Sequence, residues 1–330
     1  MPGNPVKVYF LGSGAISTPV LDGLLRSDEV ELVGIGSQCK VQKDMNKPIR
    51  TMTTPLIKHC EEKGISIDKL ATVNNESFHQ RFIDTGAEIL VVASFGQILK
   101  PALLALPKFG CLNVHASLLP KYRGASPVIA AVLNGDAVTG ISFMEMEAGL
   151  DTGGWYEMLE LEIRKNENAA DLELRLGELA GQNIGRVIWD IARNGKKPTP
   201  QSDKGISYVG KVKKEDGIVN WDCNAESIAN MVAAYTPWPS VCARIPTRNG
   251  GTRAIKITEA ESIELNCRGS QPGDILAFGR DGIIVACREG ALRIERLTPN
   301  GSKDMPACDY LRGSPIPPER SKMCDFILGD

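Results

Sequence analysis

Hydrophobic positions in the first part of the chain alternate between short continuous runs and longer stretches with helical spacing. The continuous runs are residues 6–11, 31–35, 88–93, 111–114, 140–146 and 155–163. Helical spacing follows at residues 20–25, 55–63, 101–106, 126–133 and 168–194. Strands that are covered on both faces have such continuous apolar runs, and strands that alternate with helices form parallel sheets. The pattern predicts an α/β fold with a doubly wound, mostly parallel sheet.

The composition and the hydrophobic pattern of the chain change after residue 194. Residues 195–207 combine glycine, proline and basic side chains, which is typical of a linker. A helical stretch at 225–235 then precedes short β-like runs at 241–245, 253–258, 274–278, 282–286 and 291–297. Closely spaced short strands are typical of a small β-barrel. We therefore expect a catalytic domain at 1–194, a basic linker at 195–207 and a barrel domain at 208–330, since 330 residues exceed one ordinary core.

The composition is that of an ordinary globular protein. Apolar residues make up 42% of the chain and charged residues 24%, with a formal charge of −2. The nine cysteines form no CxxC pair, so we expect reduced thiols, no metal site and a cytoplasmic location. No apolar run reaches the roughly 20 residues of a membrane span, so no membrane partner is expected.

Two polar residues follow one another at the end of a predicted strand. Asn113 and His115 are two positions apart, so their side chains lie on the same face. Ligands of open α/β sheets bind at the carboxyl ends of the strands. An amide and an imidazole there can stabilise an oxyanion and move a proton. The alternative is an interior polar pair that satisfies itself, but the turn at 117–124 exposes backbone at the same edge and favours a site.

Asp151 lies in a glycine-flanked loop after another predicted strand. It can therefore reach the same edge, where its carboxylate would raise the pKa of a nearby imidazole and orient the ring. A turn aspartate that caps its own backbone is the alternative. Asp151-Thr152-Gly153 also suggests an aspartic protease, but that chemistry needs two such carboxylates and only one Asp-Thr-Gly is present.

These segments together resemble the formyltransferase family that uses 10-formyltetrahydrofolate. The resemblance rests on Asn113-x-His115, Ser117-Leu118-Leu119-Pro120, Arg123-Gly124, Thr139-Gly140 and Gly149-Leu150-Asp151-Thr152-Gly153. It implies that Asn113 and a protonated His115 donate hydrogen bonds to the formyl oxygen. It further implies that Asp151 sustains the His115 charge and that Ser117, Leu118, Leu119 and Pro120 shape the cosubstrate pocket for 10-formyltetrahydrofolate, without a metal.

The second half resembles the C-terminal domain of family members that act on methionyl-tRNA. The similar segments are 208–221, 235–239, 272–276 and 281–292. The resemblance implies a tRNA-binding barrel of the oligonucleotide-binding (OB) type, initiator methionyl-tRNA as acceptor and a monomeric enzyme. Two alternatives stay open: a formyltransferase for a nucleotide sugar or small amine, and a formyltetrahydrofolate hydrolase.

Charge is unevenly distributed along the chain. Residues 193–214 hold seven basic side chains against one acidic one, and residues 241–256 hold four basic and no acidic ones. Residues 145–178 hold ten acidic against three basic side chains. The basic stretches predict a track for a tRNA acceptor arm. The loop at 38–48 carries Lys40, Lys43 and Lys47 but lacks the arginines and glycines of the family's acceptor-stem loop.

Overall fold

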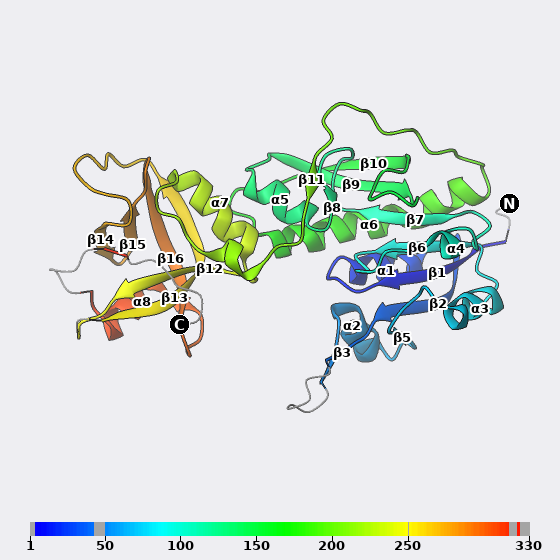
Figure 1. The fold of residues 1–330 in the computed structure, drawn as a ribbon, viewed down its shortest axis with the longest axis horizontal. Coiled ribbons are helices and arrows are strands. Elements are labelled where there is room, and N and C mark those ends of the chain that lie inside the picture. The colour runs from blue at the N-terminus through cyan, green and yellow to red at the C-terminus, as the bar shows by residue number, and fades with distance from the viewer. Residues whose placement is uncertain (1–3, 43–49, 250, 317–321, 324–330) are drawn as a thin grey trace. The chain divides into compact units, whose positions relative to one another are not determined.

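A computed structural model describes residues 4–42, 50–249, 251–316 and 322–323 (Figure 1). Contacts divide the chain into two compact units. The first comprises Met1–Pro127, Val138–Glu162 and Leu172–Val209, and the second comprises Val128–Ala137, Ile163–Asp171 and Gly210–Asp330. Residues 195–207 lie in the first unit in this division. The domain limits drawn from composition stay a prediction.

A seven-stranded sheet forms the centre of the first unit, in the order β10-β9-β7-β6-β1-β2-β5. Its strands are β1 (Val6–Gly12), β2 (Val30–Gln38), β5 (Asp68–Leu70), β6 (Ile89–Ala93), β7 (Cys111–His115), β9 (Val138–Glu145) and β10 (Trp155–Glu162). The strands from β7 to β5 are parallel, whereas β9 runs antiparallel to both β7 and β10. The prediction of a mostly parallel, doubly wound sheet is confirmed.

Short pairs of strands lie outside this sheet. β3 (Lys40–Gln42) pairs with β4 (Arg50–Met52), and β8 (Arg123–Gly124) pairs in parallel with β11 (Tyr208–Val209). The β8–β11 pair joins the segment after β7 to the end of the predicted linker. No sequence pattern predicted it, because two residues are too few for a period.

The helices of the described chain up to residue 192 are α1 (Ser17–Arg26), α2 (Pro55–Lys63), α3 (Glu76–Asp84), α4 (Pro101–Leu104), α5 (Pro127–Leu133) and α6 (Ala169–Ala192). All but α3 were predicted. Asn75 caps α3 by accepting a hydrogen bond from the Phe78 amide, and Phe78 and Phe82 bury one face of the helix. This cap and the spacing of the two phenylalanines were the signal that could have predicted α3.

The sheet is covered on both faces. Tyr9 and Leu11 of β1 pack in a cluster with Phe78 and Phe82 of α3. Phe10 points to the opposite face because side chains alternate along a strand, and it is also fully buried. Burial on both faces explains why β1 reads as a continuous apolar run in the sequence.

The second unit is built around an antiparallel sheet in the order β12-β13-β16-β15-β14. Its strands are β12 (Val241–Pro246), β13 (Thr252–Ile263), β14 (Ile275–Gly279), β15 (Gly282–Ala286) and β16 (Ala291–Pro299), with β17 (Met305–Pro306) paired to β16. A 3-10 turn η1 (Lys214–Gly217) and helices α7 (Ala225–Tyr235) and α8 (Ala307–Gly313) complete it. The predicted second, β-rich domain with one preceding helix is confirmed.

Candidate active site

Asn113 and His115 lie at the carboxyl end of β7, on one face of the sheet, as predicted. His115 is buried and Asn113 is half-buried. Within the described part of the chain, the Asn113 amide has no hydrogen-bond partner in the protein, so it can donate to a ligand. An interior pair that satisfies itself would not leave this amide free.

The imidazole of His115 has a distinct neighbour at each nitrogen. Its Nε2 atom lies 3.0 Å from the Tyr122 carbonyl oxygen. A carbonyl only accepts, so Nε2 carries a proton and donates it to Tyr122. On the other side, Nδ1 lies 3.8 Å from Asp151 Oδ2, beyond ordinary hydrogen-bond length. In a neutral ring with this tautomer, Nδ1 is the atom that accepts a proton.

Burial lowers the pKa of His115 below its ordinary value of 6.5. The Asp151 carboxylate and the Tyr122 carbonyl act in the opposite direction, since both favour the charged ring. Burial is the largest of these effects, so the ring is neutral near pH 7 in the absence of ligand. This state differs from the protonated His115 that the family resemblance implies, and it suits a base rather than an acid.

Asp151 lies beside His115, at the edge of the sheet where the sequence placed it. β9 runs antiparallel to β7, with His115 opposite Ser142 and Leu112 opposite Glu145, so β9 ends beside the amino end of β7. The loop after β9 therefore runs back along the sheet to bring Asp151 to the ring. The Gly124 amide then donates to Asp151 Oδ2 at 2.7 Å.

Gln201 is a residue of this cluster that the sequence did not reveal. It lies in the predicted linker, and its side chain donates to the carbonyl oxygens of Asp151 and Gly153 at 2.8 and 2.7 Å. Arg123 in turn donates to the Gln201 side chain. The sequence marked Arg123 only as part of Arg123-Gly124 and did not mark Gln201, because the two partners are 78 residues apart.

The segment Ser117–Pro120 forms a braced turn beside the cluster. Ser142 Oγ donates to the Ser117 carbonyl at 2.7 Å and accepts from the Leu119 amide at 3.1 Å. Ser117 and Leu119 are buried, whereas Leu118 and Pro120 are half-buried. Ser117 and Leu119 therefore lie on the inner side of the turn, and Leu118 and Pro120 form its outer surface. A cosubstrate pocket at this turn stays a prediction.

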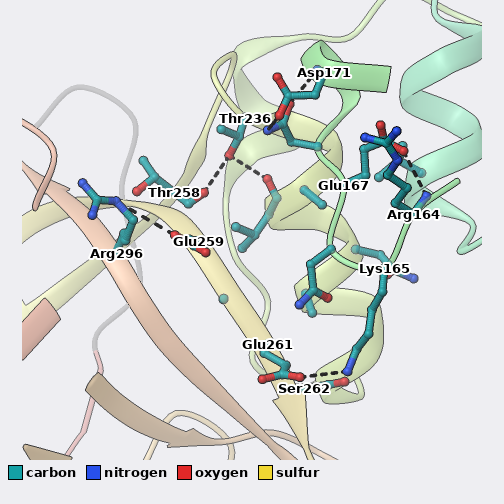
Figure 2. Close-up of a pocket in the computed structure, with 18 of the residues that line it drawn as sticks. Arg164, Lys165, Glu167, Asp171, Thr236, Thr258, Glu259, Glu261, Ser262 and Arg296 are labelled. Atoms are coloured by element: carbon teal, nitrogen blue, oxygen red, sulfur yellow. Dashed lines mark hydrogen bonds and ion pairs between the residues drawn. The ribbon is translucent and has the colours of Figure 1, made fainter. Parts of the chain in front are cut away.

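A cavity of about 1030 Å³ lies in the second unit (Figure 2). Figure 2 shows its polar lining, which includes a Lys165–Glu261 ion pair of 3.0 Å and a Thr236 hydroxyl that donates to the Thr258 carbonyl. Arg296 pairs with Glu259 at 4.0 Å on another wall. None of the predicted catalytic residues lines this cavity, so its size does not make it the reaction site.

Three further expectations concern a metal site, a membrane-spanning helix and the lysines of the loop at 38–48. Among the described residues, no three or more His, Cys, Asp or Glu side chains are grouped so that they could hold a metal ion. In the same part of the chain, no helix has the length and apolar character needed to cross a membrane. In the loop at 38–48, Lys43 and Lys47 lie outside the described residues, as does the side chain of Lys40.

An amide, an imidazole and a carboxylate at the strand ends of a doubly wound sheet define an α/β enzyme equipped for acyl transfer. The chain belongs to the formyl transferase family. The family model "Formyl transferase" matches residues 6–188, and "Formyl transferase, C-terminal domain" matches residues 211–315. The chain is 34% identical to the methionyl-tRNA formyltransferase of Geobacter metallireducens, over 95% of this chain and 97% of that one.

Solved structures show the same fold at lower sequence identity. HypX from Aquifex aeolicus in complex with tetrahydrofolic acid is 14% identical, with a TM-score of 0.61 over 94% of this chain and 47% of that chain. This chain therefore spans about half the length of HypX. An N-formyltransferase from Helicobacter canadensis, in complex with folinic acid and dTDP-3-aminofucose, is 18% identical, with a TM-score of 0.56 over 87% and 98%.

Proposed function

We propose that this protein transfers the formyl group of 10-formyltetrahydrofolate to the α-amino group of initiator methionyl-tRNA. The observation that supports it best is the 34% identity to a methionyl-tRNA formyltransferase across both domains. A similarity confined to the catalytic half would fit any acceptor. The identity extends through the second domain of a methionyl-tRNA formyltransferase, over 95% of this chain and 97% of that one, and this favours methionyl-tRNA as the acceptor.

The cluster on β7 can perform this reaction. The α-amino nitrogen attacks the formyl carbon, and the carbonyl oxygen gains negative charge as the new C–N bond forms. The free amide of Asn113 donates to this oxygen, a contact typically worth roughly 3 kcal/mol of barrier. The bond to the folate nitrogen then breaks, and that nitrogen takes up a proton as tetrahydrofolate leaves.

His115 and Asp151 handle the proton that the attacking amine loses. The neutral ring accepts it at Nδ1, the atom that faces Asp151 Oδ2 at 3.8 Å. The resulting imidazolium is stabilised by the carboxylate on one side and by the Tyr122 carbonyl on the other. The same proton can pass from His115 to the departing folate nitrogen, so the ring is neutral again after each cycle.

The tRNA acceptor would contact the lysines of the basic track that have no internal partner. Arg193 and Lys196 form ion pairs with Glu88 and Glu157, so their charges are partly neutralised. The remaining lysines of that stretch are exposed and form no ion pair within the described chain: Lys197, Lys204, Lys211, Lys213 and Lys214. Because charged tRNA is made and used in the cytoplasm, the proposal places the protein there, where it would act as a monomer.

An assay with labelled 10-formyltetrahydrofolate tests this function against its alternatives. The label is offered with methionyl-tRNA, uncharged tRNA, a nucleotide-linked amino sugar and simple amines. We expect rapid transfer to methionyl-tRNA alone. Preferred transfer to the amino sugar would assign the protein to the sugar-modifying enzymes, and release of labelled formate without an acceptor would make it a hydrolase.

A further inference from the structure

We propose that Gln201 is a positioning residue that holds the loop of Asp151 against His115. This inference rests on the proposed function, in which Asp151 stabilises the imidazolium. Gln201 lies 50 residues beyond Asp151, in the segment that leads to β11. Its Nε2 atom donates to the carbonyl oxygen of Asp151 at 2.8 Å and to that of Gly153 at 2.7 Å. Both N–H bonds of the amide are therefore used on this one loop.

The other end of the Gln201 amide is fixed as firmly. Its Oε1 atom accepts from Arg123 Nε at 3.0 Å and from Arg123 Nη2 at 2.8 Å. Arg123 is only 7% exposed, and it has no carboxylate partner within the described chain. Its Nη1 atom donates to the Tyr208 hydroxyl at 3.1 Å. Since guanidinium only donates and a carbonyl only accepts, this network permits a single orientation of the Gln201 amide.

The loop needs such support because Asp151 is held in an unfavourable backbone conformation. Its φ is +52°, a left-handed value that side chains other than glycine adopt at a cost. The loop also comes from the far end of β9, so strand pairing does not fix it near the ring. Gly124 of β8 holds the Asp151 carboxylate, and Arg123 of β8 holds its backbone through Gln201. The two residues of β8 thus position both the side-chain carboxylate and the backbone carbonyl of Asp151.

Loss of this support would weaken the influence by which the Asp151 carboxylate raises the pKa of His115. Interaction energy between two charges falls with distance, and the present separation is already 3.8 Å. Without the Gln201 amide, the carboxylate would draw away while the ring stays buried. The pKa of His115 would then fall further, as it would when the Asp151 charge is removed by Asp151→Asn.

Imidazole NMR titration tests this inference without any acceptor substrate. The chain has only three histidines, and the signal of His115 is assigned by its loss in His115→Asn. In Gln201→Met, which keeps the length but not the amide, we expect the pKa of His115 to fall below that of the wild type. The milder Gln201→Asn, whose shorter amide cannot span both carbonyls, should shift it in the same direction. Gln80→Met, an equal change on the exposed face of α3, serves as the control and should leave the titration unchanged.

Kinetics provide the second readout. We expect Gln201→Met to lower kcat for formyl transfer by ~10- to 100-fold, with the KM for methionyl-tRNA changed less than about twofold. Unchanged His115 titration in both Gln201 variants would overturn the inference, as would a kcat loss that only follows the folded fraction. If the wild type fails to formylate methionyl-tRNA, the proposed function is lost, but the titration still decides the role of Gln201.

Discussion

At His115, burial and a nearby carboxylate act on the same proton in opposite directions. Burial removes water from the ring and lowers its pKa, while Asp151 at 3.8 Å raises it. In the proposed mechanism, this net lowering of the pKa keeps His115 a neutral base for the amine proton, and Asp151 stabilises the charge after transfer. The motif could identify the two residues, but not the protonation state, which depends on burial that a single sequence does not specify.

This balance predicts how stability varies with pH. The unfolded chain binds a proton on His115 near pH 6.5, whereas the folded chain binds it only at lower pH. Between these two values the unfolded state holds more protons, so the free energy of unfolding rises with pH across that window. We expect urea unfolding at a series of pH values to show this rise, and His115→Asn to flatten it. An identical slope in the variant would mean that His115 is not buried in the neutral form.

At the scale of elements, the spacing of apolar residues predicts those helices and strands whose packing depends on residues near one another in the sequence. β1 and α6 follow from their continuous and 3.6-residue apolar patterns, because β1 is buried on both faces except at Lys7 and α6 buries one face along its length. β8 and β11 do not, because Arg123 pairs with Tyr208 across 85 residues and each strand has only two members. The antiparallel direction of β9 also escaped, since a run of apolar residues has no direction.

The β8–β11 pair provides a test at this scale. Gly124 has a φ of +116°, and a Cβ atom there would lie 2.2 Å from the Val209 carbonyl oxygen. We expect Gly124→Ala to cost roughly 1–3 kcal/mol of stability, measured by urea unfolding, and to lower kcat because the Gly124 amide holds Asp151. Gly210→Ala, one residue beyond β11 in open space, is the matched control. Equal behaviour of the two variants would exclude a role for the β8–β11 pair.

For the whole molecule, a formal charge of −2 conceals a strongly uneven distribution. The sequence could locate the basic stretches but not their unpaired charges, because partners such as Glu88 and Glu157 are far away in the sequence. Only the tertiary structure separates the internally paired Arg193 and Lys196 from the exposed lysines that follow. Those lysines are the groups available to a polyanionic acceptor.

These exposed lysines predict how tRNA binding responds to salt. Each phosphate contact releases counterions, so removing two contacts should reduce the slope of log Kd against log salt by roughly 1–2. We expect this change for Lys211→Ala with Lys214→Ala, with kcat at saturating tRNA nearly unchanged. The control double variant, Lys7→Ala with Lys108→Ala, removes two exposed lysines near the amino ends of β1 and β7, of which Lys108 pairs with Glu88 at 3.9 Å, and it should keep the wild-type slope. A slope unchanged in the first variant would remove these lysines from the tRNA interface.

The central claim is that the Asn113–His115–Asp151 cluster transfers the formyl group to methionyl-tRNA. A single-turnover measurement with saturating enzyme and labelled 10-formyltetrahydrofolate tests it most directly, because binding and product release do not contribute to the rate. For His115→Asn, we predict a rate at least ~100-fold below that of the wild type, with the Kd for methionyl-tRNA unchanged within about twofold. A variant that transfers the formyl group at the wild-type rate would contradict the claim.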